Sequence, residues 1–376
     1  MDAVRVALVI ALAAALTAAV CGGIGLGGDA IAYGAVIAAL VVRPDFSRWP
    51  GAIYPVLVLL VGFCMAIGVC LGLALASVPQ VFSFGLVAVL MQLLTLLLPT
   101  KLRMLSGLVA VAGVLPLLGG SPSWSTWGEQ LLAIAVGLAI GTITQLALTP
   151  AGRKASAEAA GKAEPEAREP EPAEPPLAQR LGEGLKSPFF WRKLVVASLA
   201  LAVGQGVGAV TPKYLYFGVV LLLNDAIGDT LLRVRDRMIG VSLGILMPLL
   251  VFNTLGMGTL QTGIVMGGTT ALVLALGAGE HLRTALISSG VSFIGYGPLV
   301  AWYVPNRWLD YLMGCGLALA VGVLLFPNSA LRRYALLSND PEANAAVLAR
   351  LLPAAREEAR WLGLPFPAPA SPPVRR

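Results

Sequence analysis

Residues 214–244 read YLYFGVVLLLNDAIGDTLLRVRDRMIGVSLG, a stretch in which a group of charged residues separates two apolar runs. An apolar run ends at Leu223 and is followed at once by Asn224 and Asp225. Further charges precede the next apolar run, namely Asp229, Arg233, Arg235, Asp236 and Arg237. A carboxylate at the edge of hydrocarbon is costly unless it is paired or faces water. These acids therefore predict either a functional group or an ion pair.

The spacing of the charges suggests how such a pair forms. If one helix continues through the stretch, Asp225, Asp229 and Arg233 lie four residues apart on one face, with each acid before its partner, which is the favoured order for helical ion pairs. Two interpretations of Asp225 and Asp229 stay open. They exchange a proton during transport, or they are structural partners of Arg233 and Arg237.

The composition predicts a membrane protein. Hydrophobic residues make up 57% of the chain and charged residues 12%, and the mean hydropathy is +0.82. Soluble domains average about 25% charged residues, and only lipid accommodates this much apolar surface. The net charge of +6 does not indicate nucleic acid binding, because the basic residues lie in short loops and tails rather than on one continuous face.

The hydropathy pattern predicts an all-α polytopic fold with about twelve transmembrane helices, arranged as two parallel six-helix repeats. The predicted spans are residues 3–22, 30–42, 52–76, 80–98, 104–118, 129–149, 192–210, 214–227, 238–255, 259–278, 282–300 and 309–326. We interpret the first span as a retained helix rather than a cleaved signal peptide, because only Arg5 precedes its apolar run.

Four segments follow from these spans. The first six-helix unit covers residues 1–150, a linker rich in Pro, Glu and Lys covers 151–188, the second unit covers 189–327, and a soluble tail covers 328–376. The linker has no apolar period and is predicted to be a solvated tether. The tail is expected to contain one short helix within residues 338–352, lying on the membrane or on the protein's cytosolic face and interrupted by Pro353.

The distribution of basic residues predicts the orientation. With the N-terminus inside and twelve spans, 24 of the 26 Lys and Arg residues fall in cytosolic segments, and only Lys213 and Arg307 lie outside. This asymmetry follows the positive-inside rule and favours two cytoplasmic termini.

A nearly constant offset between the halves predicts the repeat. Tyr33-Gly34 corresponds to Phe217-Gly218, residues 101–103 correspond to 281–283, and Trp127 corresponds to Trp308. Because each unit has an even number of spans, both copies enter from the cytosol and the repeat is parallel. Asp225 aligns with Val41, so the second unit is expected to carry the function.

Two motifs in the second half resemble a known family. The segment RMIGVSLG resembles the R-x-x-G-T-x-x-G signature of the fusaric-acid-resistance-like membrane proteins, the superfamily of aromatic acid exporters. The segment RWLDYLMGCGLALAVGVLLFP is similar to the closing helix of the same family. The matching residues are Arg237, Gly240, Gly244, Arg307, Asp310, Gly314, Ala318, Ala320 and Pro327. The resemblance implies six-helix units that export aromatic carboxylic acids from bacterial inner membranes.

Other signals indicate packing rather than chemistry. Gly240, Gly244 and Gly314 are interpreted as sites of close helix approach. The four cysteines lack metal-ligand spacing, and the glycines at 23, 25 and 28 are not preceded by a strand as a nucleotide site requires. His281 is the only histidine, and with Glu280 it forms either a helix-end pair or a cytosolic proton relay. We therefore predict no enzyme activity, no metal and no cofactor.

The sequence thus favours a proton-coupled exporter of small aromatic organic anions. Arg233, Arg235 and Arg237 attract a carboxylate at the cytosolic mouth, and Asp225 or Asp229 exchanges a proton. Two alternatives stay open, an organic-anion channel and an accessory scaffold of a membrane complex. The expected partners are the lipid bilayer, a small organic anion, a periplasmic adaptor protein and a second copy of the chain, with no nucleic acid.

Overall fold

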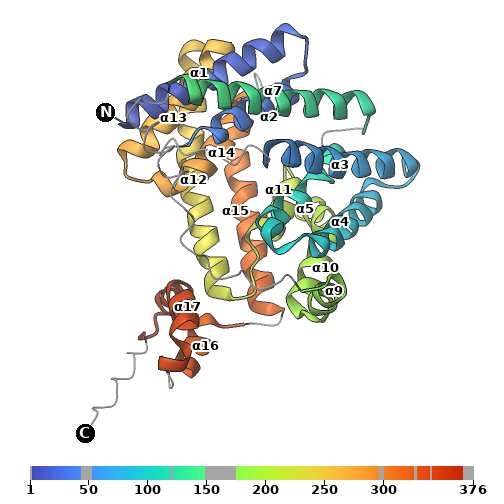
Figure 1. Cartoon of the computed structure of the whole chain (residues 1–376), viewed down its shortest axis with the longest axis vertical. Helices are drawn as coiled ribbons and strands as arrows, with labels where there is room; N and C mark the ends of the chain where they lie inside the picture. The colour runs from blue at the N-terminus through green and yellow to red at the C-terminus, as the bar shows by residue number, and fades with distance from the viewer. Residues whose placement is uncertain are drawn as a thin grey trace, which may run out of the picture. The chain divides into compact units, whose positions relative to one another are not determined.

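The structure is a computed structural model that describes residues 2–43, 53–118, 122–148, 175–295, 300–325, 328–338 and 341–366. These residues form helices and connecting turns without any strand (Figure 1). The prediction of an all-α protein is therefore confirmed.

Some of the described helices are long and apolar enough to cross a membrane. They are α1 (Asp2–Gly23), α3 (Ile53–Ala74), α4 (Gln80–Leu97), α7 (Trp124–Leu148) and α12 (Ile227–Leu255). A further span is added if α9 (Leu177–Lys186) and α10 (Pro188–Gly206), which are bent by 73° at their junction, count as one. The chain thus has the apolar helices of a membrane protein.

The remaining elements are shorter or less apolar. They are α2 (Gly28–Val41), η1 (Thr100–Leu105), α5 (Ser106–Ala112), α6 (Leu115–Leu118), α11 (Lys213–Leu222), α13 (Thr259–Ala275), η2 (Gly279–His281), α14 (Leu282–Ile294), α15 (Val300–Leu324), α16 (Ala330–Leu337) and α17 (Pro341–Leu362). Every predicted span overlaps a helix. Several of these helices fall below the roughly 20 residues that cross a bilayer upright, so twelve crossings stay a prediction.

The chain divides into two compact units. The first combines Met1–Arg180 with Ile239–Trp308, and the second combines Leu181–Met238 with Leu309–Arg376. The first unit therefore contains residues from both sides of the predicted linker.

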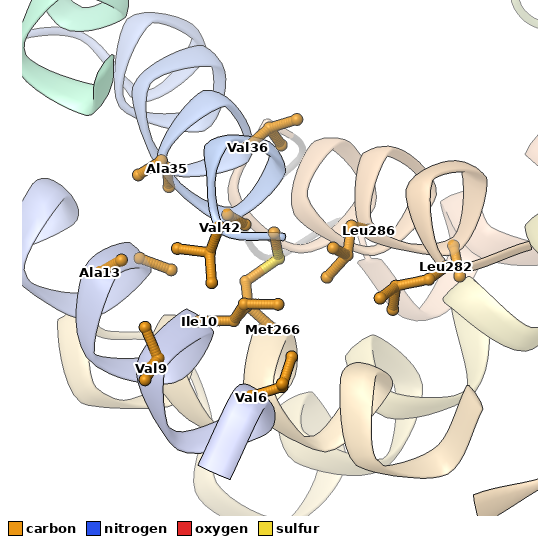
Figure 2. Packing of buried hydrophobic residues seen from close by; sticks show 14 of the residues in the cluster. Val6, Val9, Ile10, Ala13, Ala35, Val36, Val42, Met266, Leu282 and Leu286 are labelled. Carbon is orange, nitrogen blue, oxygen red and sulfur yellow. The ribbon is translucent and has the colours of Figure 1, made fainter. Parts of the chain in front are cut away.

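The core of the first unit lies where α1, α2, α13 and α14 meet (Figure 2). Ile10 and Met266 are completely buried there. Gly263 and Gly267 on α13 bring that helix against α1, because a Cβ at either position would lie within 3 Å of the backbone at Ala11 or Ala7. Close approach over small residues is the usual way in which apolar helices pack in lipid.

The tail differs from the prediction. It forms two helices, α16 and α17, and α17 continues through Pro353, so the predicted interruption there is wrong. A proline inside a helix removes one hydrogen bond. The next two residues, Ala354 and Ala355, are completely buried in a cluster with Tyr334 of α16, and this packing holds the second half of α17 in place.

The end of the predicted linker also differs. Residues 149–174 lie outside the described residues, but Leu177–Lys186 forms α9. Leu177, Leu181 and Leu185 recur every fourth residue and lie on one face of this helix. The segment therefore has an apolar period, whereas the sequence predicted a solvated tether without one.

Candidate functional site

The candidate site lies in the second unit, at a break between α11 and α12. Helix α11 ends at Leu222 and α12 begins at Ile227. The single helix that would place Asp225, Asp229 and Arg233 on one face therefore does not form. Asp225 lies in the break, outside α12.

Two contacts replace helical hydrogen bonds at this break. The backbone N–H of Asn224 donates to Oγ1 of Thr230 at 3.0 Å, and the N–H of Ile227 donates to the carbonyl oxygen of Asn328 at 3.0 Å. The Asn224 side chain also donates to the carbonyl oxygen of Leu222 at 3.1 Å. These partners satisfy the backbone N–H groups of Asn224 and Ile227 where the helical ladder is interrupted.

Arg192 near the start of α10 joins the break to the end of α15. Its side chain is 5% exposed, and its guanidinium donates to the carbonyl oxygens of Leu325 at 2.6 Å and Asn224 at 3.1 Å. A cation at the carbonyl end of a helix is electrostatically favourable. This role was not predicted from the sequence, where Arg192 falls among the predicted cytosolic charges. An arginine directly inside the run FFWRKLVV was the available signal.

The two candidate acids have different surroundings. Asp225 is exposed, and its carboxylate accepts a 2.8 Å hydrogen bond from the side chain of Asn328. Asp229 lies half-buried in the first turn of α12, where a negative charge is favoured by the helix dipole. It lies within electrostatic range of Arg233, Asp225 and Glu358. The structure therefore brings Asp225, Asp229 and Arg233 together, although not as a helical ladder.

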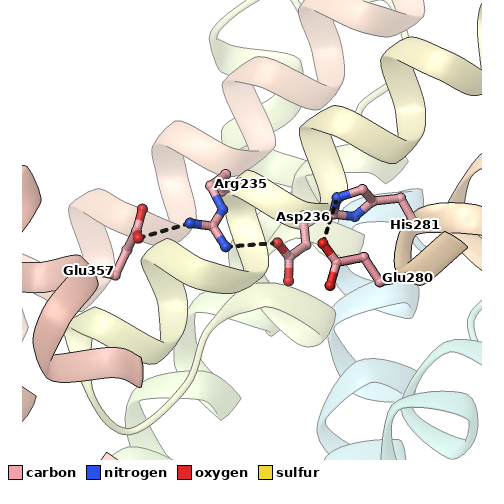
Figure 3. Close-up of polar contacts among 5 residues, drawn as sticks. All are labelled: Arg235, Asp236, Glu280, His281 and Glu357. Atoms are coloured by element: carbon pink, nitrogen blue, oxygen red, sulfur yellow. Dashed lines mark hydrogen bonds and ion pairs between the residues drawn. The ribbon is translucent and has the colours of Figure 1, made fainter. Parts of the chain in front are cut away.

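The three candidate arginines also differ. Arg233 is exposed and donates to the carbonyl oxygen of Leu221 at 3.4 Å, and Arg237 is half-buried. Arg235 forms ion pairs with Glu357 of α17 at 2.9 Å and with Asp236 at 3.5 Å (Figure 3). The tail therefore engages the middle arginine of the predicted anion site.

Glu358 fixes the tail at this place. It is 2% exposed, and its Oε2 accepts hydrogen bonds from the N–H groups of Ala330 at 2.8 Å and Leu331 at 3.3 Å. It thus caps the first turn of α16. Gly228 in α12 lies directly against the backbone of Ala354, with no room for a Cβ. Nothing in the local sequence distinguishes buried Glu358 from Glu357, whose side chain is 19% exposed, so this role could not be predicted.

The remaining candidates lie elsewhere. In the first unit, Nε2 of buried His281 lies 3.4 Å from Oε1 of exposed Glu280 (Figure 3). Gly240 and Gly244 on α12 lie against Thr284 and Ala285 of α14. In the second unit, a Cβ on Gly314 of α15 would lie 2.7 Å from the carbonyl oxygen of Tyr214, so these three glycines occupy close helix contacts.

The site offers charged groups but no metal cage. In the described part of the chain, no group of three or more His, Cys, Asp or Glu residues is placed to hold a metal ion. What the arrangement provides is an exposed carboxylate, a second acid at a helix N-terminus and arginines close by. No family model, curated protein or solved structure matches the chain.

Proposed function

We propose that this protein is a proton-coupled exporter of small aromatic organic anions in the bacterial inner membrane. One observation carries the proposal: the apolar run that ends α11 breaks at Leu223–Ala226, and charged groups gather at that break. In lipid, a non-helical backbone is tolerated only where it is buried in protein or lines a water-filled cavity. Interrupted helices are a frequent basis for substrate sites in secondary transporters.

In this mechanism the side chains at the break have separate roles. Exposed Arg233 attracts the carboxylate of the substrate, and half-buried Arg237 lies one turn further along α12. Asp225 exchanges a proton with the solution, because it is exposed and has a neutral hydrogen-bond partner in Asn328. Asp229 is the second candidate for the proton, with Arg233 close enough to stabilise its charge. Binding of a substrate anion at Arg235 requires competition with Glu357.

The proposal includes twelve crossings, two parallel six-helix repeats and two cytoplasmic termini. The charge asymmetry of the loops supports the orientation, because Lys and Arg concentrate in cytosolic segments. Matched contacts in the two halves support the repeat.

The first matched contact is made by the paired tryptophans. Trp127 on α7 donates through Nε1 to the carbonyl oxygen of Gly62 on α3 at 3.0 Å. Trp308 on α15 donates through Nε1 to the hydroxyl of Ser242 on α12 at 3.0 Å. The tryptophans are 181 positions apart and their acceptors 180 positions apart, which favours descent from one unit.

The second matched contact involves an acid two residues after each tryptophan. Glu129 accepts a 3.3 Å hydrogen bond from the N–H of Gly27, just before α2. Asp310 accepts hydrogen bonds from the N–H groups of Val210 at 3.2 Å and Thr211 at 2.6 Å, just before α11. In each half, one acid therefore holds the connection between the first and second helices.

The third matched contact joins the first helix of each half to the end of its last helix. Arg5 on α1 donates to the carbonyl oxygen of Leu148 at the end of α7, at 2.7 and 3.1 Å. Arg192 on α10 donates one hydrogen bond to the carbonyl oxygen of Leu325 at 2.6 Å. An arginine on the first helix thus reaches the carbonyl end of the last helix in both halves.

Transport assays on paired variants test the proposal. Asp225→Asn keeps the size of the side chain but removes its charge, and we expect the purified variant in liposomes to lose gradient-driven uptake of a radiolabelled hydroxybenzoate. Asp29→Asn removes an acid from the first turn of α2, outside the break, and should keep that uptake. Uptake that rises linearly with substrate concentration would instead indicate a channel. If the unaltered protein shows no uptake, the accessory-scaffold function would be favoured.

A further inference from the structure

Three buried hydroxyl groups of the first unit are unusual. Thr269 on α13 and Ser288 and Ser292 on α14 are 0%, 1% and 0% exposed. Within the described residues, none of these three hydroxyl groups has a hydrogen-bond partner. A buried hydroxyl without a partner costs about 1–3 kcal/mol, so its solvation needs an explanation.

The missing partners are not a general feature of hydroxyls in these helices. Elsewhere, a hydroxyl donates to the carbonyl oxygen four residues earlier, at 2.7 to 2.9 Å. This holds for Thr17, Thr142, Ser198, Thr254, Thr262 and Thr270. The neighbouring Ser289 bonds to Leu286 and to the sulfur of Met266. The hydroxyls of Thr269, Ser288 and Ser292 make no such bond within the described residues.

The two serines face α12. A Cβ on Gly244 of α12 would lie 2.8 Å from Cβ of Ser288, so this serine points at that helix. Ser292 follows one turn later on the same face of α14.

Thr269 reaches the same interface from α13. Its neighbour Gly268 lies against Met247 of α12. Val265, four residues before Thr269 and on the same face, packs with Met247 and Val251 of α12. The three unpaired hydroxyls therefore line the place where α12, α13 and α14 meet.

We propose that this interface binds ordered water molecules, held by the hydroxyls of Thr269, Ser288 and Ser292. Water fits because the three groups are neutral and each can donate and accept a hydrogen bond. Buried water typically serves polar groups that the protein leaves unsatisfied. The proposal is independent of the transport proposal, because it concerns only what solvates these hydroxyls.

Cysteine accessibility tests the proposal directly. In a variant whose four native cysteines are replaced by alanine, single cysteines are introduced at Thr269, Ser288 and Ser292. Thr270→Cys and Ser289→Cys are matched controls, because both positions are completely buried but have hydroxyl partners. Thiols react as thiolates, which form in hydrated surroundings, so a small methanethiosulfonate reagent should modify the three test positions severalfold faster than the controls. Equal rates would overturn the proposal.

A stability measurement covers the case in which a cysteine variant fails to fold. Ser288→Ala and Ser292→Ala remove one hydroxyl each and leave the packing almost unchanged. If the hydroxyls hold water, both changes should lower the midpoint of thermal unfolding in detergent. If the interface is dry, removing an unpaired hydroxyl should raise that midpoint, and the proposal would be wrong.

Discussion

The guanidinium of Arg192 donates a 2.6 Å hydrogen bond to the carbonyl oxygen of Leu325, 133 residues further along the chain. Its other terminal nitrogen bonds to Asn224 in the break. One buried side chain therefore links α10, the break before α12 and the end of α15. We infer that this link fixes the position of the charged groups of the candidate site.

Replacing Arg192 should destabilise this region. Arg192→Met leaves two carbonyl oxygens without their charged donor, and we expect a loss of about 3 kcal/mol in the free energy of unfolding. Arg192→Lys keeps the charge but cannot reach both acceptors with one ammonium, so part of the loss should remain. Thermal unfolding in detergent measures both. Arg333→Lys, on the exposed side of α16, should be neutral. Full stability of Arg192→Met would contradict the structural role.

Glycine substitutions test the close contact of α11 and α15. A Cβ on Gly218 would lie 2.6 Å from the carbonyl oxygen of Gly314, whereas a Cβ on Gly316 meets nothing within 4 Å. Gly218→Ala should therefore destabilise the protein by about 1–3 kcal/mol, since overpacking forces the helices apart. Gly316→Ala should keep or raise stability, because alanine is the better helix former. The difference in unfolding midpoint between the two variants is the readout, and equal midpoints would show that the helices are not in contact.

Adjacent glutamates in α17 should respond very differently to neutralisation. Glu358→Gln weakens the cap on α16 at a buried position, with an expected loss of about 1–2 kcal/mol. Glu357→Gln removes one ion pair with Arg235, whose side chain is 44% exposed, and should cost at most about 1 kcal/mol. Limited proteolysis of the tail compares the two variants. Faster cleavage of Glu357→Gln than of Glu358→Gln would contradict the assigned roles.

The paired tryptophans test the internal repeat. Trp127→Phe and Trp308→Phe each remove an indole N–H that donates a 3.0 Å hydrogen bond, and each variant keeps an aromatic ring. If the two halves are equivalent units, the losses of stability should agree within about 0.5 kcal/mol and should add in the double variant, as expected for independent sites. Differential scanning fluorimetry measures all three. An effect confined to one tryptophan would argue against equivalent contacts.

Helix positions could be predicted from the sequence because hydropathy is a local property. The first predicted span, residues 3–22, is found as α1 at Asp2–Gly23. Gly240 and Gly244 could be recognised as packing positions by their spacing alone, and they do lie against α14. In both cases the residues that carry the pattern lie within a single helix, so no distant partner is needed to recognise it.

The features that the sequence analysis missed depend on partners far away in the chain. The break before α12 is stabilised by Asn328, and the burial of Arg192 depends on Leu325. The helix that continues through Pro353 is held by packing on α16. Periodicity and local propensity contain no information about such contacts, because tertiary packing overrides them.

The central claim is transport of aromatic organic anions coupled to protons, and uptake into an acidic lumen tests it most directly. Liposomes that contain the purified protein, with an acidic lumen and the membrane potential clamped, are mixed with a radiolabelled hydroxybenzoate. A proton antiporter releases protons from the lumen and takes up the anion, so we predict saturable accumulation inside, which collapses when a protonophore is added. A weak acid that crosses by passive diffusion accumulates in an alkaline lumen instead, so the two processes require opposite pH gradients. No accumulation above that of empty liposomes, or accumulation only in an alkaline lumen, would contradict the account.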